Sequence, residues 1–252
     1  MNILARFRSI DESHKAAVVR KLMESSTPNF DFFYLTSLSV LMATLGLLAD
    51  SASIVIGSML IAPLLYPILG VSLGLVMSNP EVISRSFFTL VKAMGFGLIL
   101  SVAATVLLGD GNTGYEIMSR TEPNLLHLMV AVVAGAAVSF ALSQPEWSET
   151  LPGIAISVAL IPPLAVVGVG IAYLDMDIVS GSLVMLIMNL VGIMFAAMVS
   201  FSFMNLYEKQ AIAASTIKKQ EEKEQREREA IAETEEEMKE EAAEHKVPNN
   251  LG

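Results

Sequence analysis

Residues that could bind a solute gather in an apolar stretch that two prolines interrupt. This stretch runs from Gly57 to Gly70 and reads GSMLIAPLLYPILG. A proline removes one amide donor and leaves the carbonyl four residues earlier without its helical partner. At membrane depth such carbonyls persist only where protein or water satisfies them, so a broken helix can line a pathway. The candidate pathway residues in this stretch are Ser58, Pro63, Tyr66 and Pro67.

A second stretch, from Ser157 to Gly170, resembles the first. At an offset of 100, LIAPL at 60–64 aligns with LIPPL at 160–164, and Gly70 aligns with Gly170. A proline that only kinks a helix for packing is the alternative interpretation of each pair. The candidate pathway residues here are Ser157, Pro162 and Pro163.

Two polar residues lie in the apolar segments that follow these stretches. Lys92 is the only Lys or Arg inside a predicted span, and a charge within the membrane usually marks a functional position. Its long side chain could instead reach the nearby cytoplasmic interface. Asn189 could line the pathway or form a hydrogen bond between helices. The sequences KAMG at 92–95 and NLVG at 189–192 can be aligned as a weaker echo of the repeat.

The composition is typical of a membrane protein. Of the 252 residues 53% are hydrophobic and only 17% are charged, and the mean hydropathy is +0.57. A helix needs roughly 20 apolar residues to cross a bilayer. Six segments come close to this length or exceed it: about 32–48, 53–77, 86–108, 124–142, 152–174 and 178–204. The predicted fold class is therefore all-α, a polytopic integral membrane helix bundle of about six spans.

The order of the segments predicts an inverted repeat. Each proline-containing segment is the second of three, so the two copies would cover about 31–108 and 124–206. Three crossings are an odd number, and the second copy must then enter the membrane from the opposite side. Two inverted three-span repeats with broken helices at corresponding positions are typical of transporters.

The distribution of Lys and Arg predicts the orientation. Most of these residues precede the first span, lie in the second connection or follow the last span, whereas Arg120 alone lies in the other connections. The positive-inside rule then places both termini in the cytoplasm and the protein in the cytoplasmic membrane. The outer connections carry acids that could attract cations or simply be solvated: Asp50, Asp110, Glu116, Glu122, Asp175 and Asp177.

Two polar segments flank the predicted spans. Residues 1–30 form a cytoplasmic arm, in which the pattern from Asp11 to Met23 predicts a short amphipathic helix on the membrane surface or, equally, a partly ordered arm. Residues 207–252 form a tail that holds 13 of the 26 acids and 8 of the 16 bases. Opposite charges three or four residues apart predict that this tail is a solvated cytoplasmic helix.

The remaining features predict neither an enzyme nor a cofactor. The chain has no cysteine, which excludes thiolate metal sites and thiol nucleophiles, and it has no nucleotide-binding loop or zinc-protease motif. We expect no metal and no nucleic acid. His127, near the outer end of the fourth span, is a weak candidate for a proton role. The expected partners are membrane lipids, an unidentified ion or small solute and, from the small residues in the spans, further copies of the chain.

The two proline motifs also carry a family resemblance. GSMLIAPL at 57–64 and ALIPPL at 159–164 are similar to sequences in the membrane family called domain of unknown function 389, found in bacteria and archaea. The resemblance covers roughly Phe32 to Leu206 and implies a membrane fold without implying an activity. From the broken spans and the predicted inverted repeat we expect a transporter or channel-like protein, with a non-transporting scaffold or signalling protein that acts through its tail as the alternative.

Overall fold

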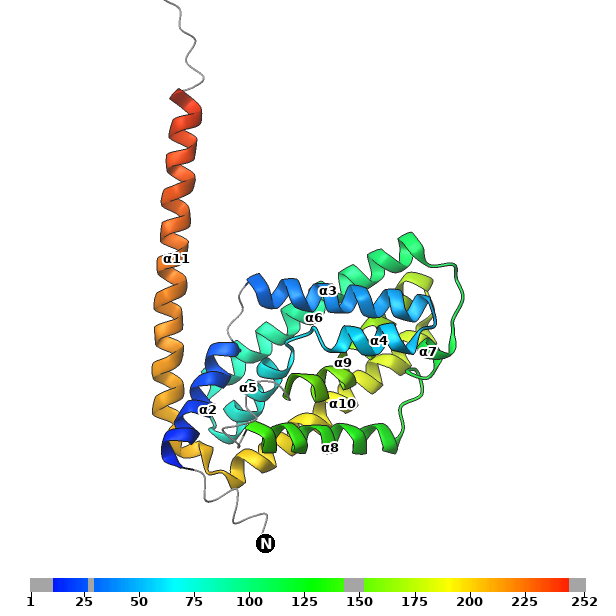
Figure 1. Ribbon diagram of the computed structural model, residues 1–252, viewed down its shortest axis with the longest axis horizontal. Helices are drawn as coiled ribbons and strands as arrows, with labels where there is room; N and C mark the ends of the chain where they lie inside the picture. The colour runs from blue at the N-terminus through cyan, green and yellow to red at the C-terminus, as the bar shows by residue number, and fades with distance from the viewer. Residues whose placement is uncertain (1–10, 27–29, 143–151, 245–252) are drawn as a thin grey trace, which may run out of the picture.

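A computed structural model describes residues 11–26, 30–142 and 152–244, and every regular element in these ranges is a helix (Figure 1). Side chains are not described for residues 152–159 or for most of 232–244. In chain order the helices are α2 (Glu12–Ser25), α3 (Phe30–Leu48), α4 (Ala52–Met59), α5 (Leu65–Val76), α6 (Pro80–Leu108), α7 (Tyr115–Met118), α8 (Leu125–Leu142), α9 (Pro152–Tyr173), α10 (Met176–Phe203), the short 3-10 helix η1 (Leu206–Lys209) and α11 (Gln210–Glu244).

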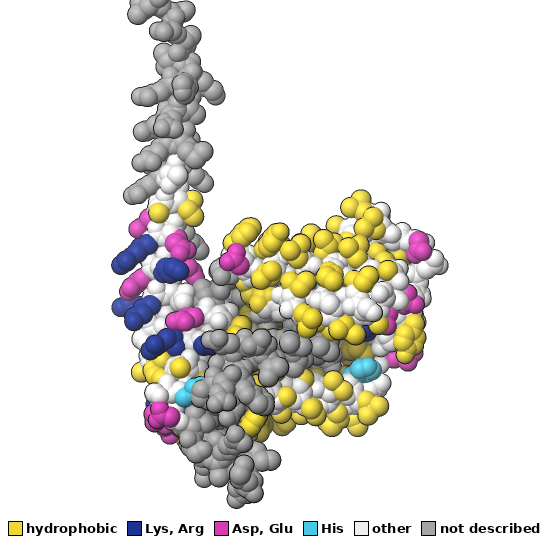
Figure 2. Space-filling view, viewed as in Figure 1, with side chains coloured by type: hydrophobic (Ala, Val, Ile, Leu, Met, Phe, Trp, Pro, Cys, Tyr) yellow, Lys and Arg dark blue, Asp and Glu magenta, His cyan; other side chains and the backbone are white. Residues whose placement is uncertain are grey.

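Apolar helices form a bundle in which α9 lies among its neighbours α3, α6, α8 and α10. Four helices in the described part of the chain are long and apolar enough to cross a membrane: α3, α6, α8 and α10. Large apolar side chains cover much of the lateral surface of this bundle, as Figure 2 shows. Because water would disfavour so much exposed apolar area, the bundle has the character of a membrane protein.

Polar contacts define two opposite ends of the bundle. At the tail end, Gln210 Nε2 donates to the carbonyl of Met77, which joins the start of α11 to the turn between α5 and α6 (2.6 Å). At the other end, which we call the α7 end, Asp50 Oδ1 accepts from the amide of Glu116 (2.7 Å). The turns after α3 and α9 both lie at the α7 end, because Tyr173 Oη also accepts there from the amide of Gly111 (3.3 Å).

Three of the turns between helices have the same backbone geometry. Each places a residue other than glycine in the left-handed region, namely Asp50 (φ 47°), Ser78 (φ 52°) and Leu174 (φ 57°). The next residue donates its amide hydrogen to a carbonyl five residues earlier, and in all three turns that carbonyl belongs to a glycine: Gly46, Gly74 and Gly170. This is the Schellman arrangement, which satisfies the last carbonyls of a helix. The residue that donates this hydrogen bond also caps the next helix in two of the turns, as Asn79 does for α6 and Asp175 does for α10.

The amphipathic helix predicted between Asp11 and Met23 is present as α2. Its apolar side chains pack against α5 and α11, and Val19 and Leu22 are fully buried. An ion pair between Glu12 Oε2 and Lys209 Nζ at 2.5 Å joins α2 to the residue that precedes α11. The N-terminal arm and the tail therefore lie at the same end of the bundle.

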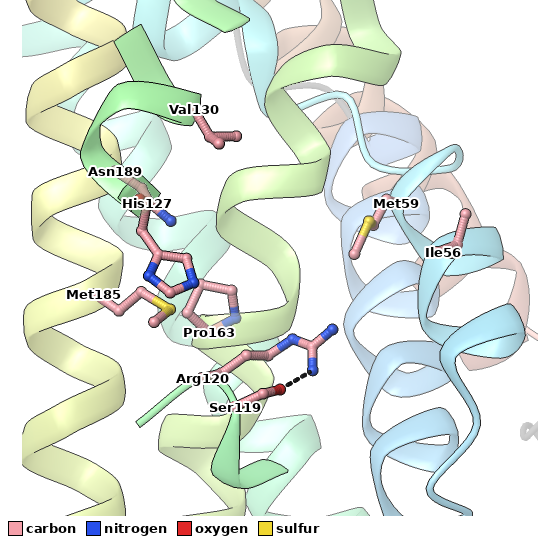
Figure 3. Close-up of a pocket in the computed structure, with 9 residues that line it drawn as sticks. All are labelled: Ile56, Met59, Ser119, Arg120, His127, Val130, Pro163, Met185 and Asn189. Carbon is pink, nitrogen blue, oxygen red and sulfur yellow. Dashed lines mark hydrogen bonds between the residues drawn. The ribbon is translucent and has the colours of Figure 1, made fainter. Parts of the chain in front are cut away.

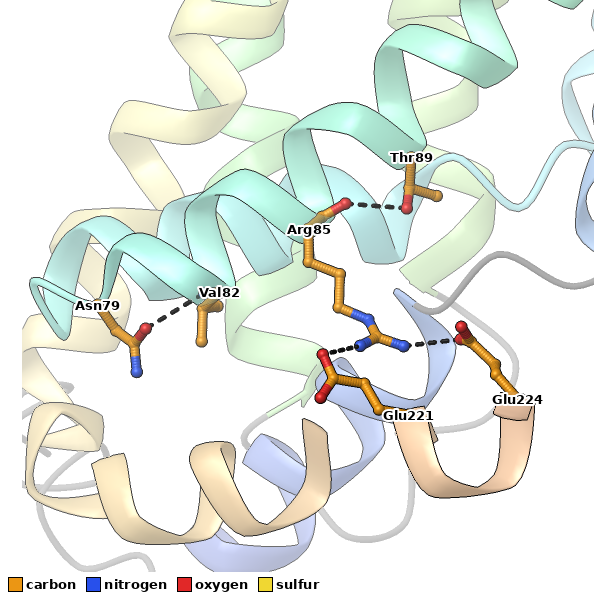
Figure 4. A network of polar contacts seen from close by, with 6 residues as sticks. All are labelled: Asn79, Val82, Arg85, Thr89, Glu221 and Glu224. Carbon is orange, nitrogen blue, oxygen red and sulfur yellow. Dashed lines mark hydrogen bonds and ion pairs between the residues drawn. The ribbon is translucent and has the colours of Figure 1, made fainter. Parts of the chain in front are cut away.

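The tail helix α11 is anchored to the bundle by Arg85 of α6 (Figure 4). Its Nη1 lies 3.2 Å from Glu221 Oε1, and its Nη2 lies 2.7 Å from Glu224 Oε1. Beyond these contacts α11 projects away from the bundle, as Figure 1 shows. The tail is helical over Gln210–Glu244.

The prediction of a broken helix is confirmed for the first proline stretch. Helix α4 ends at Met59 and α5 begins at Leu65, so residues 60–64 are unwound. Pro63 and Pro67 are four residues apart, so in a continuous helix their missing amide hydrogens would interrupt two successive turns on one side. Pro67 lies in the first turn of α5, where an amide hydrogen has no helical partner to lose.

The prediction of a broken helix is wrong for the second proline stretch. Helix α9 continues without interruption through Pro162 and Pro163. Adjacent prolines remove donors within a single turn, and the neighbouring helices hold that turn in place. Leu160, Ile161 and Ala165 are buried in the core, and Ser101 Oγ of α6 donates to the carbonyl of Ala165 (2.9 Å). Tertiary packing thus outweighs the local effect of the two prolines.

Candidate functional site

A cavity of about 540 Å³ opens between α4 and the group formed by α8, α9 and α10, close to the α7 end. Its walls are mainly apolar, with a few polar groups on one side. Figure 3 shows its nine lining residues, which come from five segments of the chain. They are Ile56, Met59, Ser119, Arg120, His127, Val130, Pro163, Met185 and Asn189.

The cavity brings together parts of both proline stretches. Met59 is the last residue of α4, directly before the unwound segment, and it lines the cavity opposite Pro163 of α9. Asn189 of α10 lies in the same wall and is 6% exposed. Pro163 and Asn189 are thus the two predicted site residues that line this cavity.

The other predicted site residues lie elsewhere. Ser58, Pro63, Tyr66, Pro67, Lys92 and Pro162 do not line this cavity, and the side chain of Ser157 is not among those that the structure describes. The carbonyl of Tyr66 accepts a hydrogen bond from Ser26 Oγ at the end of α2 (2.9 Å), which places Tyr66 on the side of the tail end.

Ser58 supports the unwound segment through hydrogen bonds within the protein. Its hydroxyl group donates to the carbonyl of Val55 (2.6 Å), and its own carbonyl accepts from Ser39 Oγ of α3 (2.6 Å) and from the amide of Ile61 (3.2 Å). A carbonyl at the end of a buried helix must find such partners. Ser58 therefore has a structural role in the break, and its hydroxyl group is already used.

Lys92 lies on the outer surface of α6. The exposed residues around it are apolar and include Phe88 and Phe96. The side of α6 that faces α3 and α9 includes the buried Gly97, which lies close to Val40 and Leu164. Lys92 thus lies outside the interior of the bundle, and the reach of its side chain to the cytoplasmic interface stays a prediction.

Two charged or titratable side chains at the cavity were not among the predicted pathway residues, although His127 was a weak candidate for a proton role. Arg120 follows α7 and forms an ion pair with Glu116, whose Oε2 lies 2.9 Å from Arg120 Nη1. His127 lies in the first turn of α8, which Asn124 caps. Two features of the sequence could have drawn attention to them: Arg120 is the single base of the predicted outer connections, and His127 lies near the end of a predicted span. Neither feature indicates that α7 folds back over the bundle.

Several of the outer acids have local structural roles. Asp50 caps α7, and Asp175 caps α10 by accepting from the amides of Asp177 and Ile178. Asp110 accepts from the amide and side chain of Asn112, and these hydrogen bonds lower the pKa of Asp110. These carboxylates stabilise turns and caps, and none of them lines the cavity. Within the described residues, no three His, Asp or Glu side chains come close enough together to hold a metal ion.

Comparison with known proteins identifies the family of the chain. The family model described as domain of unknown function, DUF389, matches residues 59–195, which is more than half of the chain. The chain belongs to the DUF389 family. The matched region begins at the end of α4 and includes α5 to α9 and most of α10, so it contains eight of the nine residues that line the cavity. Helices α2, α3 and α11 lie outside the match.

One curated relative is similar over most of this region. It is an uncharacterized protein of Methanocaldococcus jannaschii, 32% identical over 167 residues, which are 66% of this chain and 51% of the relative. The chain thus spans about half the length of that relative. No solved structure matches the chain significantly.

Proposed function

We propose that this DUF389 protein is a transporter or channel-like protein for an ion or small solute, and that the cavity beside α4 is part of its pathway. The observation that carries the proposal is that the unwound end of α4 and Pro163 of α9 face the same cavity. An interrupted helix beside a cavity is a common setting of transporter binding sites. The cavity volume also falls within the range of small-molecule sites.

The proposed topology has six crossings of the cytoplasmic membrane with both termini in the cytoplasm. Helices α4 and α5 together would form the second crossing and α9 the fifth. The contacts of α2 with α11 and of Gln210 with Met77 support a common side for the termini and the second connection. The basic residues near these segments support that side as the cytoplasmic one.

The proposed repeats are inverted, and the geometry of the turns supports a specific register. The turn after α5 lies at the tail end, and the similar turn after α9 lies at the α7 end. Aligning these turns relates Gly74 to Gly170 at an offset of 96, and the same offset relates Pro67 to Pro163 and Ser86 to Ser182. Both serines are buried. This register replaces the offset of 100 that the LIAPL and LIPPL motifs indicate.

The absence of native cysteine allows a direct test of the pathway. The full chain with Met59→Cys is reconstituted in liposomes, and the fluxes of potassium, chloride, acetate and methylammonium are measured before and after treatment with a membrane-impermeant thiol reagent. We expect at least one flux above that of empty vesicles, and we expect the reagent to block it. Gly95→Cys is the matched control, because Gly95 lies in α6 outside the cavity with open space beside it.

Two outcomes would overturn the proposal. One is that none of a broad panel of ions and small solutes crosses the liposome membrane faster than in empty vesicles. The other is a flux that treatment blocks equally in the Met59→Cys and Gly95→Cys proteins, because the cavity would then have no special role.

A second candidate function is a membrane scaffold or signalling protein that acts through its tail. The observation that favours it is the length of α11, which has 35 residues and extends well past its contacts with Arg85. A chain that ends at Glu227 would keep those contacts. If this truncation abolishes the cellular phenotype while Pro163→Ala leaves it intact, the scaffold function is favoured over transport.

A further inference from the structure

We infer that the cavity binds a small organic anion with a single negative charge, such as a monocarboxylate, and that Arg120 and His127 hold its charged group. This inference rests on the proposed function for its role in transport, although binding itself can be measured separately. It assigns a charge sign that the sequence leaves open, since the outer acids favour a cation and Lys92 favours an anion.

The first argument is that Lys92, which favours an anion, and the outer acids, which favour a cation, lie outside the cavity. Lys92 is exposed on the outer face of α6. Asp50, Asp110 and Asp175 are engaged in caps and turns. The described cavity wall contains one permanently charged side chain, Arg120. A guanidinium group in a mainly apolar wall attracts an anion and repels a cation.

The second argument is the hydrogen bonding of Arg120. Its contacts within the described residues all use Nη1, which lies near Glu116 Oε2 and donates to the carbonyl of Glu116 and to Ser119 Oγ. A guanidinium group has five N–H donors in a planar fork. Nη2 and Nε form no hydrogen bond with the described residues, and Figure 3 shows the guanidinium group between Pro163 and the α4 residues that line the cavity. One edge of the fork thus remains available to a carboxylate.

The third argument is a buried nitrogen of His127. Its Nδ1 atom is inaccessible to solvent and has no hydrogen-bond partner among the described residues. Buried polar atoms in folded proteins nearly always have a partner, and exceptions often mark a site for a ligand or water. Because His127 lines the same cavity, rotation of its imidazole ring would let this nitrogen, in its protonated tautomer, donate a hydrogen bond to an anion bound by Arg120.

The remaining wall defines the charge and the body of the ligand. Glu116 already compensates much of the charge of Arg120, and this disfavours an anion with two negative charges. Ile56, Met59, Val130 and Met185 offer apolar contact area. A carboxylate with a small hydrocarbon body therefore fits both parts of the cavity better than sulfate or phosphate.

Binding by the purified full chain in detergent micelles tests this inference. Isothermal titration uses benzoate and acetate as organic monoanions, sulfate as a dianion and methylammonium as a cation. We expect benzoate to bind, with methylammonium at least about tenfold weaker because it cannot accept a charge-assisted hydrogen bond from Arg120. Sulfate should also bind more weakly than benzoate, because Glu116 compensates much of the charge of Arg120 and sulfate has no hydrocarbon body. Arg120→Gln should weaken benzoate binding about tenfold, and Lys92→Gln should leave it unchanged.

The variant Glu116→Gln distinguishes a role of Arg120 in binding the anion from a purely structural role of Arg120. If the ion pair only stabilises the loop, Glu116→Gln and Arg120→Gln should both weaken binding. If Arg120 binds the anion, Glu116→Gln should strengthen benzoate binding severalfold because it removes the competing carboxylate. The double variant Glu116→Gln/Arg120→Gln leaves no unpaired charge, so loss of binding in this protein would exclude misfolding caused by an isolated Glu116.

The inference fails if benzoate and acetate do not bind to the wild-type chain, or if methylammonium binds more tightly than either. It also fails if Arg120→Gln binds benzoate as well as the wild type does. Liposome flux of a cation without monoanion binding would overturn this inference and leave the proposed function standing. Benzoate binding that depends on Arg120, without flux of any solute, would overturn the proposed function and leave this inference standing.

Discussion

Gly74 and Gly170 have equivalent positions in two helical hairpins, although 96 residues separate them. Each carbonyl accepts a hydrogen bond at 2.9 Å from the amide five residues later, at Asn79 and at Asp175. A Cβ atom added to either glycine would lie 2.9 Å from a backbone nitrogen of the following helix, at Ile83 and at Val179. The hairpins are therefore closed by backbone contacts that only glycine permits.

We predict that Gly74→Ala and Gly170→Ala each destabilise the protein. The added methyl group meets rigid backbone, which cannot move aside as the end of a side chain can. Overpacking of this kind costs about 1–3 kcal/mol. The measurement is the thermal unfolding temperature of each purified variant in the same detergent.

Gly95→Ala is the matched control, because a Cβ at this position meets nothing within 4 Å. Alanine is a better helix former than glycine, so this variant should match or slightly exceed the stability of the wild type. Equal losses in all three variants would mean that glycine is needed for backbone flexibility rather than for close packing.

The register of the two hairpins illustrates what the sequence can and cannot predict. Matching LIAPL with LIPPL depends on apolar residues, which coincide easily between any two membrane helices. The turns instead combine a glycine four residues before the left-handed residue with Asn79 or Asp175 as the cap of the next helix, and these requirements are more specific. The positions and lengths of the apolar segments were predictable because burial in lipid demands them. Whether a proline breaks a helix was not, because tertiary packing decides it for α9.

The cavity likewise contains residues that the sequence could predict and residues that it could not. Pro163 and Asn189 were predictable as candidates, because a proline or an amide within an apolar helix is unusual in itself. Arg120 and His127 were assigned to a connection and to the end of a span, where solvent would be their ordinary surroundings. Their position depends on Asp50, which caps α7 from the end of α3 and holds it against the bundle. A contact between residues 66 positions apart leaves no periodic signal in the sequence.

Leu174 is predicted to be a site where substitution stabilises the protein. It has φ 57°, a left-handed conformation that is unfavourable for leucine, and it is 81% exposed. Asparagine adopts this conformation more readily, so Leu174→Asn should raise the free energy of unfolding by about 1 kcal/mol. Thermal unfolding in detergent measures the change. Met176→Asn, at an exposed helical position two residues later, should bring no such gain.

Ser39 is predicted to stabilise the unwound segment after α4. Its hydroxyl group donates to the carbonyl of Ser58, and both residues are fully buried. Ser39→Ala should lower the stability by about 1 kcal/mol through loss of this hydrogen bond. Hydrogen–deuterium exchange should become faster at residues 58–64 in particular. Ser180→Ala is the control, because it removes a hydroxyl group from an exposed residue, and it should change neither the stability nor the exchange rate. Faster exchange throughout the bundle in Ser39→Ala would contradict a local role of Ser39.

Arg85 is predicted to hold the first turns of α11 against the bundle. Its guanidinium group contacts Glu221 and Glu224, and its side chain is only 18% exposed. Arg85→Gln should accelerate hydrogen exchange in residues 210–227 and should lower the overall stability by no more than about 1 kcal/mol, since both acids are partly solvated. Raising the salt concentration should have the same effect on the wild type. Arg20→Gln, which changes an exposed residue of α2, is the control, and equal acceleration in that variant would refute a specific role of Arg85.

The contact between α2 and α11 is predicted to weaken in acid. Hydrogen bonds from Lys15 and Lys209 lower the pKa of Glu12 from 4.5 to about 2. Folding therefore favours the carboxylate, and its contribution is complete above about pH 4.5 and disappears as the pH falls toward 2.

Spin labels on Arg20→Cys and Lys218→Cys can follow the distance between α2 and α11, because both positions are exposed and the chain has no native cysteine. The distance distribution should broaden between pH 4.5 and 2 in the wild type, whereas Glu12→Gln should already be broad at pH 7 and should change less with pH. Glu24→Gln, at an exposed position of the same helix, should behave as the wild type does. A transition that persists unchanged in Glu12→Gln would assign the acid sensitivity to other groups.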